Sequence, residues 1–121
     1  MKESILKQKS FNFAVRIVNL YKYLCDEKKE FVLSKQVLRS GTSVGAMVRE
    51  AEHSESKADF VHKMAIAQKE INETLYWLEL LSKTEYITNT EFDSIKPDAV
   101  EIIKLLTSSI KTAKKSLTTK H

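Results

Sequence analysis

Two acid–histidine pairs are the residues of this chain best suited to bind a metal. Glu50 precedes His53 by three positions, and Asp59 precedes His62 by three. On a helix this spacing places both side chains of a pair on one face, as in the Glu-x-x-His motif of di-iron bundles. A di-iron site also needs a carboxylate from the middle of each of the other two helices, and the first helical segment has none in its interior. We therefore expect no metal site and no cofactor, with both histidines on the surface near a helix turn.

Nucleophilic catalysis has little support either. Cys25 falls on an apolar row, where a free thiol more often packs than reacts. No serine stands with a histidine and an acid in a recognisable local motif. Gly41 and Gly45 are the two glycines of the chain, too few for a phosphate-cradling loop elsewhere. We expect no catalytic residues and a protein that is not an enzyme.

The composition indicates one all-α domain over residues 1–121. Two glycines and one proline leave few places for the turns of a β fold. A chain of 121 residues can bury one hydrophobic core but not two. The single cysteine cannot form an internal disulfide, and the N-terminus lacks the apolar stretch of a signal peptide. No apolar run approaches the roughly 18 residues of a membrane span, so we expect a cytoplasmic protein without membrane contact.

Four segments carry the apolar spacing of amphipathic helices. Their short connections make consecutive helices antiparallel, so the predicted fold is an all-α, antiparallel up-down-up-down four-helix bundle. The expected N-caps of the last three helices are Ser34, Ser56 in a capping box with Asp59, and Thr90. Pro97 should kink the last helix, or start it afresh after one short turn. The expected helices cover residues 10–27, 34–54, 56–83 and 90–117 approximately.

The first two helices have unusual faces. Apolar residues cover more than half of the first helix in two neighbouring rows, which is wider than one bundle core needs. This width fits either a crowded central helix or a second contact surface. In the second helix, Gly41 and Gly45 each cost roughly 1 kcal/mol of helix stability relative to alanine. Close approach of a neighbouring helix would offset that cost, with no functional meaning required.

The third helix carries a second apolar row that includes two carboxylates. Exposed aromatic and aliphatic side chains of this kind usually mark an interface. We predict a subunit contact in which Glu70 or Glu73 meets a basic residue such as Arg39 or Arg49. The alternative is a wide, partly exposed helix face. The predicted interface residues are Arg39, Arg49, Ile66, Glu70, Glu73, Tyr76, Trp77 and Leu80.

Lysines gather near both termini, which an up-down-up-down bundle places at the same end. Residues 1–9 carry a formal charge of +2 and residues 111–121 of +4, against +4 for the whole chain, so the rest of the chain nets −2. Such an end could meet phosphates of RNA or DNA, and a ring of subunits would multiply it. Lysine-rich tails can also serve solubility alone. The predicted phosphate contacts are Lys2, Lys7, Lys9, Lys111, Lys114, Lys115 and Lys120.

The second and third helices together resemble a known family. The stretches that carry the resemblance are residues 38–46, 49–51, 56–63, 66–70 and 73–81. They are similar to the four-helix-bundle proteins encoded in intervening sequences of bacterial 23S rRNA genes. The first and last helices agree with that family in length. The resemblance is specific for the fold and much less so for function, because many members have no known role.

The resemblance implies a ring-like homo-oligomer, with a pentamer as the expected state. A relative, the accessory variability determinant of diversity-generating retroelements, is a basic pentameric barrel that binds nucleic acid and a reverse transcriptase. This chain differs at Met47, where many members have asparagine, and its net charge is milder than that of the basic relative. By resemblance, the assembly or framework residues are Arg39, Glu50, Glu70, Glu73, Tyr76 and Trp77.

The function that we expect is therefore that of a non-enzymatic, homo-oligomeric adapter. It would contact RNA or DNA through its lysine-rich end, with little base specificity. A protein partner such as a reverse transcriptase is possible by the same resemblance. The alternative is a protein-binding structural scaffold without nucleic-acid binding.

Overall fold

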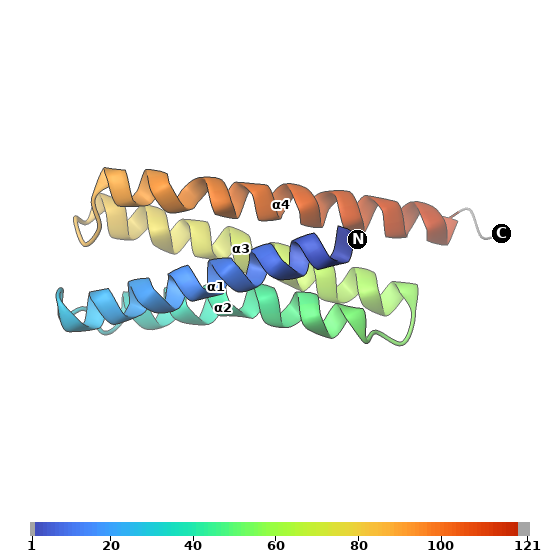
Figure 1. Ribbon diagram of the computed structural model, residues 1–121, viewed down its shortest axis with the longest axis horizontal. Coiled ribbons are helices and arrows are strands. Elements are labelled where there is room, and N and C mark those ends of the chain that lie inside the picture. Colours follow the sequence, from blue (N-terminus) through green and yellow to red (C-terminus); the bar gives the residue numbers. More distant parts are fainter. Residues whose placement is uncertain (1, 119–121) are drawn as a thin grey trace.

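The protein folds as an all-α, antiparallel four-helix bundle, as predicted (Figure 1). The computed structural model describes residues 2–118, and the side chains of residues 5–117. Within that part of the chain the helices are α1 (Lys2–Asp26), α2 (Leu33–Glu52), α3 (Lys57–Lys83) and α4 (Asn89–Thr118). No helix in the described residues has an apolar stretch long enough to cross a membrane.

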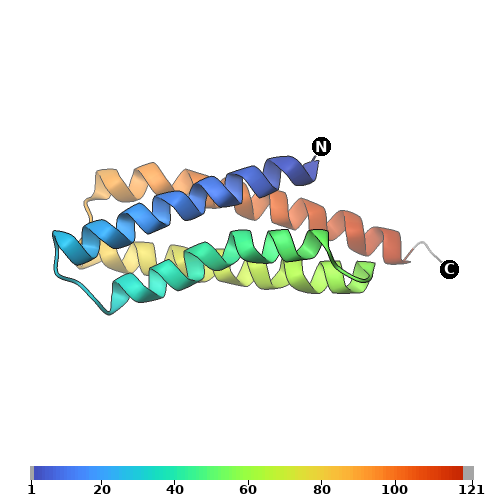
Figure 2. The same cartoon turned by 60° about the horizontal axis from the view of Figure 1, so that its bottom comes forward.

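The up-down-up-down order brings the start of α1, the α2–α3 turn and the end of α4 to one end of the bundle (Figures 1 and 2). The start of α1 stops short of both the α2–α3 turn and the end of α4 in both views. Helices α1 and α4 also pack against each other less closely than any other neighbouring pair. The last turns of α4 therefore face α2 and α3 without a fourth helix beside them.

Helix α1 begins at Lys2, eight residues before the predicted start. Leu6 is buried in the core, and Ser10 is buried against α2. Leu6 continues the row of Phe13 and Ile17 toward the N-terminus at helical spacing. Lys7 and Lys9 do not end the helix, because packing of the apolar row against the core determines the length of α1 more than the local charge does.

Close packing between α1 and α2 accounts for Gly41. A Cβ atom there would lie only 2.7 Å from Cγ1 of Ile17, a side chain that is fully buried. One turn further on, a Cβ on Gly45 would lie 3.3 Å from the backbone oxygen of Ser10. Both small residues therefore allow the backbones to approach, and the predicted structural role of this pair is confirmed.

Helix α2 is capped by a residue that the sequence analysis missed. Ser34 was the predicted N-cap, but it lies inside the helix and is fully buried. The cap is the carboxylate of Glu30, which accepts the backbone N–H groups of Val32, Leu33 and Ser34 at 3.2, 3.0 and 2.7 Å. A carboxylate suits this place because the first N–H groups of a helix are unpaired and carry partial positive charge.

The caps of the other two helices follow sequence chemistry more closely. Ser56 Oγ accepts the N–H of Asp59 at 3.0 Å, as predicted, but the Asp59 carboxylate accepts the N–H of Glu55 at 3.2 Å, so the return bond of the predicted capping box goes to the residue before Ser56. At α4 the predicted cap, Thr90, is wrong by two residues. Thr88 accepts the N–H of Glu91 at 3.1 Å, while the Glu91 carboxylate accepts the N–H of Thr88 at 2.7 Å. This reciprocal pair starts the helix earlier than expected.

Helix α4 runs through Pro97 as one helix, so the expected fresh start is wrong. Pro97 is exposed, and its ring removes a single backbone donor. Arg16 of α1 forms hydrogen bonds with two residues of α4, one on each side of the proline. Its guanidinium donates to the Ser94 carbonyl at 3.1 Å, to Ser94 Oγ at 2.9 Å and to Asp98 Oδ2 at 2.8 Å. These bonds tie the two turns around the proline to α1.

Candidate nucleic-acid and subunit surfaces

The second half of α4 carries a ridge of exposed lysines, here called the basic ridge: Lys104, Lys111, Lys114 and Lys115. Lys104, Lys111 and Lys115 are separated by seven and four residues, which places them on one outward face of the helix. No Asp or Glu follows Glu101 in the chain. Between Lys104 and Lys111 the surface forms a shallow depression of about 420 Å³, which Thr107 and Thr112 also line.

The N-terminal lysines are placed differently from this ridge. Lys7 forms an ion pair of 3.3 Å with Glu52 of α2, and Lys9 one of 3.2 Å with Glu101 of α4. These partners lie far away in the sequence, so charge counting along the chain did not reveal them. Each pair leaves less net positive charge for a phosphate at the start of α1.

Lys57, at the start of α3, was not predicted as a contact, yet its Nζ donates to Ser116 Oγ of α4 at 2.7 Å. It therefore lies beside the basic ridge. Lys120 lies outside the described residues, and the side chain of Lys2 lies outside the described side chains.

The predicted interface row on α3 is built around Arg39 of α2. The Arg39 guanidinium donates to Glu70 at 3.2 Å and forms a short ion pair with Glu73. The indole N–H of Trp77 donates to the same Glu73 carboxylate at 3.0 Å. The acid–arginine contact expected between subunits is thus made within one chain. The Trp77 hydrogen bond, followed by the Arg39 contact, lowers the pKa of Glu73, and the Glu73 contact raises that of Arg39.

The apolar members of this row are unequally exposed. Trp77 is half-buried and packs against the core, and Ile66 and Leu80 are half-buried as well. Tyr76 is 58% exposed and meets the Trp77 ring edge-on, with the ring centroids 4.9 Å apart. Trp77 therefore contributes to the packing of its own chain, while Tyr76 offers an uncovered aromatic ring.

Exposed apolar side chains also lie on α1 and on the loop after it. Phe11 and Val15 of α1 are 51% and 44% exposed, and Val32 of the loop is 70% exposed. Arg49, the other predicted basic interface residue, lies over the Phe11 ring at 5.2 Å from its centroid rather than beside the α3 carboxylates. The wide apolar face of α1 was the sequence signal for the exposed residues of that helix. The exposed large apolar residues of α1 and the loop are Ile5, Phe11, Val15, Phe31 and Val32.

The acids, histidines and cysteine suited to metal or thiol chemistry are distributed over α1, the end of α2 and the start of α3. In the described part of the chain, no group of three or more His, Cys, Asp and Glu side chains could hold a metal ion. Asp59, one of the acids considered, pairs with Lys63 at 3.0 Å, and this contact lowers the pKa of its carboxyl. Cys25 is half-buried with its Sγ 3.8 Å from Ser34 Oγ, so it packs between α1 and α2.

The fold and these surfaces define a small antiparallel bundle with a basic ridge at one end. The chain belongs to the family of 23S rRNA-intervening sequence proteins, whose pattern matches residues 2–108. The resemblance seen in the sequence is thereby confirmed. Most of the basic ridge lies beyond the matched residues. The relation to the accessory variability determinant stays a prediction.

A solved structure has the same fold. It is a protein of unknown function from the S23 ribosomal protein family, from Bacteroides thetaiotaomicron VPI-5482. That protein is 63% identical to this chain, with a TM-score of 0.90 over 92% of this chain and 99% of the other. No curated protein matches the chain.

Proposed function

We propose that the protein is a non-enzymatic, homo-oligomeric adapter that contacts RNA or DNA through the basic ridge. The observation that carries this proposal is the charge of α4 after Glu101, where Lys104, Lys111, Lys114 and Lys115 are exposed and no acidic residue follows. A protein partner such as a reverse transcriptase belongs to the same proposal. The cytoplasm is the compartment that this function requires.

The length of the basic ridge suits a nucleic-acid backbone. At about 1.5 Å of rise per residue, Lys104 and Lys115 lie roughly 16 Å apart along the helix. A duplex carries one charge per about 1.7 Å of its axis, so about ten phosphates fall within that length. Each lysine can therefore meet a phosphate, and none needs to read a base.

Assembly of several copies would multiply this weak contact. The exposed apolar side chains on α1 and its following loop, together with Tyr76 on α3, offer surfaces that a second copy could cover. A ring with five basic ridges would bind a long strand through many phosphates at once. The pentamer itself is proposed from the family resemblance.

The test is binding to a labelled 30-nucleotide RNA and the matching DNA duplex at several salt concentrations. Four phosphate contacts predict that affinity falls about a hundredfold between about 50 and 200 mM salt for one chain. Charge reversal of Lys111, Lys114 and Lys115 to Glu should abolish binding. The matched control reverses Lys22, Lys35 and Lys83, three exposed lysines at the other end of the bundle, and should retain most of it. Equal loss in both triple variants, or binding that survives salt, contradicts the proposal.

A protein-binding scaffold is the second candidate, favoured by the exposed apolar residues on α1. Light scattering of the native chain and of a Glu73→Ala, Trp77→Ala variant addresses assembly directly. A native mass of several subunits that falls to one in a variant that stays helical supports the α3 row as the interface. An oligomer that persists in this variant but is lost in Phe11→Ser, Val15→Ser moves the interface to α1. A monomeric native chain contradicts the oligomeric adapter.

A further inference from the structure

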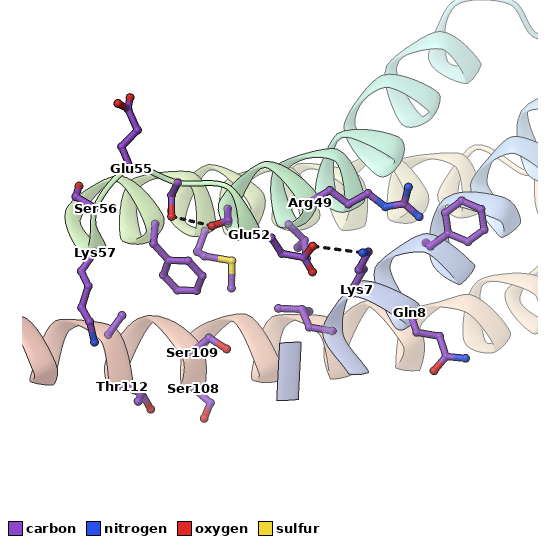
Figure 3. Close-up of a pocket in the computed structure, with 18 residues that line it drawn as sticks. Lys7, Gln8, Arg49, Glu52, Glu55, Ser56, Lys57, Ser108, Ser109 and Thr112 are labelled. Atoms are coloured by element: carbon purple, nitrogen blue, oxygen red, sulfur yellow. Dashed lines mark hydrogen bonds and ion pairs between the residues drawn. The ribbon is translucent and has the colours of Figure 1, made fainter. Parts of the chain in front are cut away.

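At the end of the bundle where α1 stops short, the core is left open as a hollow of about 1010 Å³ (Figure 3). It lies between the α2–α3 turn, the start of α1 and the last turns of α4. Its size is at the upper end of what small-molecule pockets in proteins have, and spaces between the helices of bundles are among the places where they form. The hollow is much larger than one side chain could fill by changing its rotamer.

The wall of the hollow is mainly apolar. Phe60 is half-buried on α3, and Phe11 is half exposed at the side of α1. Water in contact with such a wall is released when an apolar ligand enters, and this favours binding. The apolar side chains that line the hollow are Leu6, Phe11, Val48, Ala51, Phe60, Met64 and Ala113.

The charges around the hollow are not balanced. Lys7 and Glu52, which both line the hollow, form an ion pair of 3.3 Å, so these two charges offset each other. Glu55 points away from the hollow, whereas Lys57 extends from α3 toward α4 along its edge (Figure 3). Arg49 adds a second cation at the opposite side. The edge of the hollow at Lys57 is therefore positive. The neighbouring basic ridge adds to the positive potential there.

We propose that this hollow binds a single-chain anionic amphiphile, a molecule with an apolar chain and a carboxylate head of the fatty-acid class. The chain lies against Phe60 and Met64, and the carboxylate meets Lys57 at the edge. Small-molecule sites are typically lined by apolar side chains, and a few polar groups fix the orientation of the ligand. A mainly apolar hollow with one charge-assisted contact fits this description. This inference goes beyond nucleic-acid binding and does not depend on it.

The test uses delipidated protein and dodecanoate, followed by titration calorimetry below the concentration at which dodecanoate forms micelles. We expect one dodecanoate per chain and, because the head is anionic, at least about tenfold weaker binding of dodecyltrimethylammonium. Lys57→Glu should weaken dodecanoate binding about tenfold. Lys83→Glu, which reverses an exposed lysine at the far end of α3 that does not line the hollow, should leave it unchanged.

A second variant tests the hollow itself by narrowing it. Ser109→Phe adds a large ring to its wall and should weaken dodecanoate binding, while Thr90→Phe at the other end of the bundle should leave it unchanged. Circular dichroism checks that both variants stay folded. The proposal is overturned if dodecanoate does not bind, if the cationic amphiphile binds equally well, or if Ser109→Phe lowers the solution mass because a second copy occupies the hollow. If the triple lysine variant loses RNA binding, the proposal that the hollow binds dodecanoate is not affected.

Discussion

The backbone N–H of Ser34 donates a hydrogen bond of 2.7 Å to Oε1 of Glu30, while Oε2 of the same carboxylate accepts the N–H groups of Val32 and Leu33. The carboxylate is almost fully buried, at 8% exposure of the residue. One side chain thus pairs three backbone donors at the start of α2. The backbone N–H of Glu30 in turn donates to the carbonyl of Leu24 at 3.0 Å, which ties the loop to the end of α1.

Replacing Glu30 by Ala should therefore lower the free energy of unfolding by about 1–2 kcal/mol, the usual effect of losing a helix cap. Urea unfolding followed by circular dichroism measures the change. Glu27→Ala, an exposed acid at the end of α1, is the matched control and should change stability by less than about 0.5 kcal/mol. Equal stability of the two variants would show that water replaces the cap at no cost.

Gly41→Ala should destabilise the protein, although alanine is the better helix former. The added Cβ would lie 2.7 Å from Cγ1 of the buried Ile17, and overpacking of this kind costs about 1–3 kcal/mol. This exceeds the gain of about 1 kcal/mol in helix propensity. In an Ile17→Ala background the contacts with Cγ1 and Cγ2 are removed and only the Cβ at position 17 remains, at 3.2 Å, so the same Gly41→Ala change should be much less destabilising. Thermal unfolding of the four proteins tests this coupling, and an equal loss of stability in both backgrounds contradicts it.

The sequence predicted the four helices because each core row repeats at helical spacing over several turns. Val37, Val44 and Val48 on α2 and Met64 and Ile71 on α3 stand at such spacing, and all five are buried. A helix packs against a core only if one whole face is apolar, so the apolar repeat stays visible even where charged residues lie between its members.

Helix boundaries and surface contacts were harder to predict, since they depend on partners outside the local sequence. Glu30 caps α2 from the loop before the helix. It was not recognised in the sequence because it is not one of the usual capping residues such as Ser or Thr. The pairing of Lys9 with Glu101 joins α1 to α4, so it exists only once the bundle has formed. Glu70 or Glu73 was expected to meet a basic residue such as Arg39 or Arg49 of another subunit, but both carboxylates pair with Arg39 of their own chain.

The network around Glu73 should make stability depend on pH in the acid range. Hydrogen bonds from Trp77 and Arg39 lower the pKa of Glu73 in the folded protein below its usual value of about 4.3. A lowered pKa contributes stability that is complete above the unfolded-state pKa and is lost as the pH falls through the folded-state pKa. The stability difference between the wild type and Glu73→Gln should therefore shrink from about pH 6 to about pH 3. Glu79→Gln, an exposed acid on the same helix, is the control, and a difference that stays constant with pH contradicts the assignment.

Between α2 and α3, the hydroxyls of Ser40 and Thr74 share a hydrogen bond of 2.8 Å, and both residues are fully buried. Thr74 also bonds the Glu70 carbonyl of its own helix at 2.7 Å, so it keeps a partner when Ser40 is removed.

Ser40→Ala should therefore cost only about 1 kcal/mol, the net value of one hydrogen bond. Thr74→Val should cost more, because Ser40 then lacks a partner in an apolar interior. In the double variant no hydroxyl is left unpaired between the helices, so its loss of stability should be smaller than the two single losses added together. Urea unfolding of the four proteins gives this coupling energy, expected at about 0.5–1.5 kcal/mol. Strict additivity would mean that each hydroxyl is satisfied within its own helix and that the bond between α2 and α3 contributes nothing to stability.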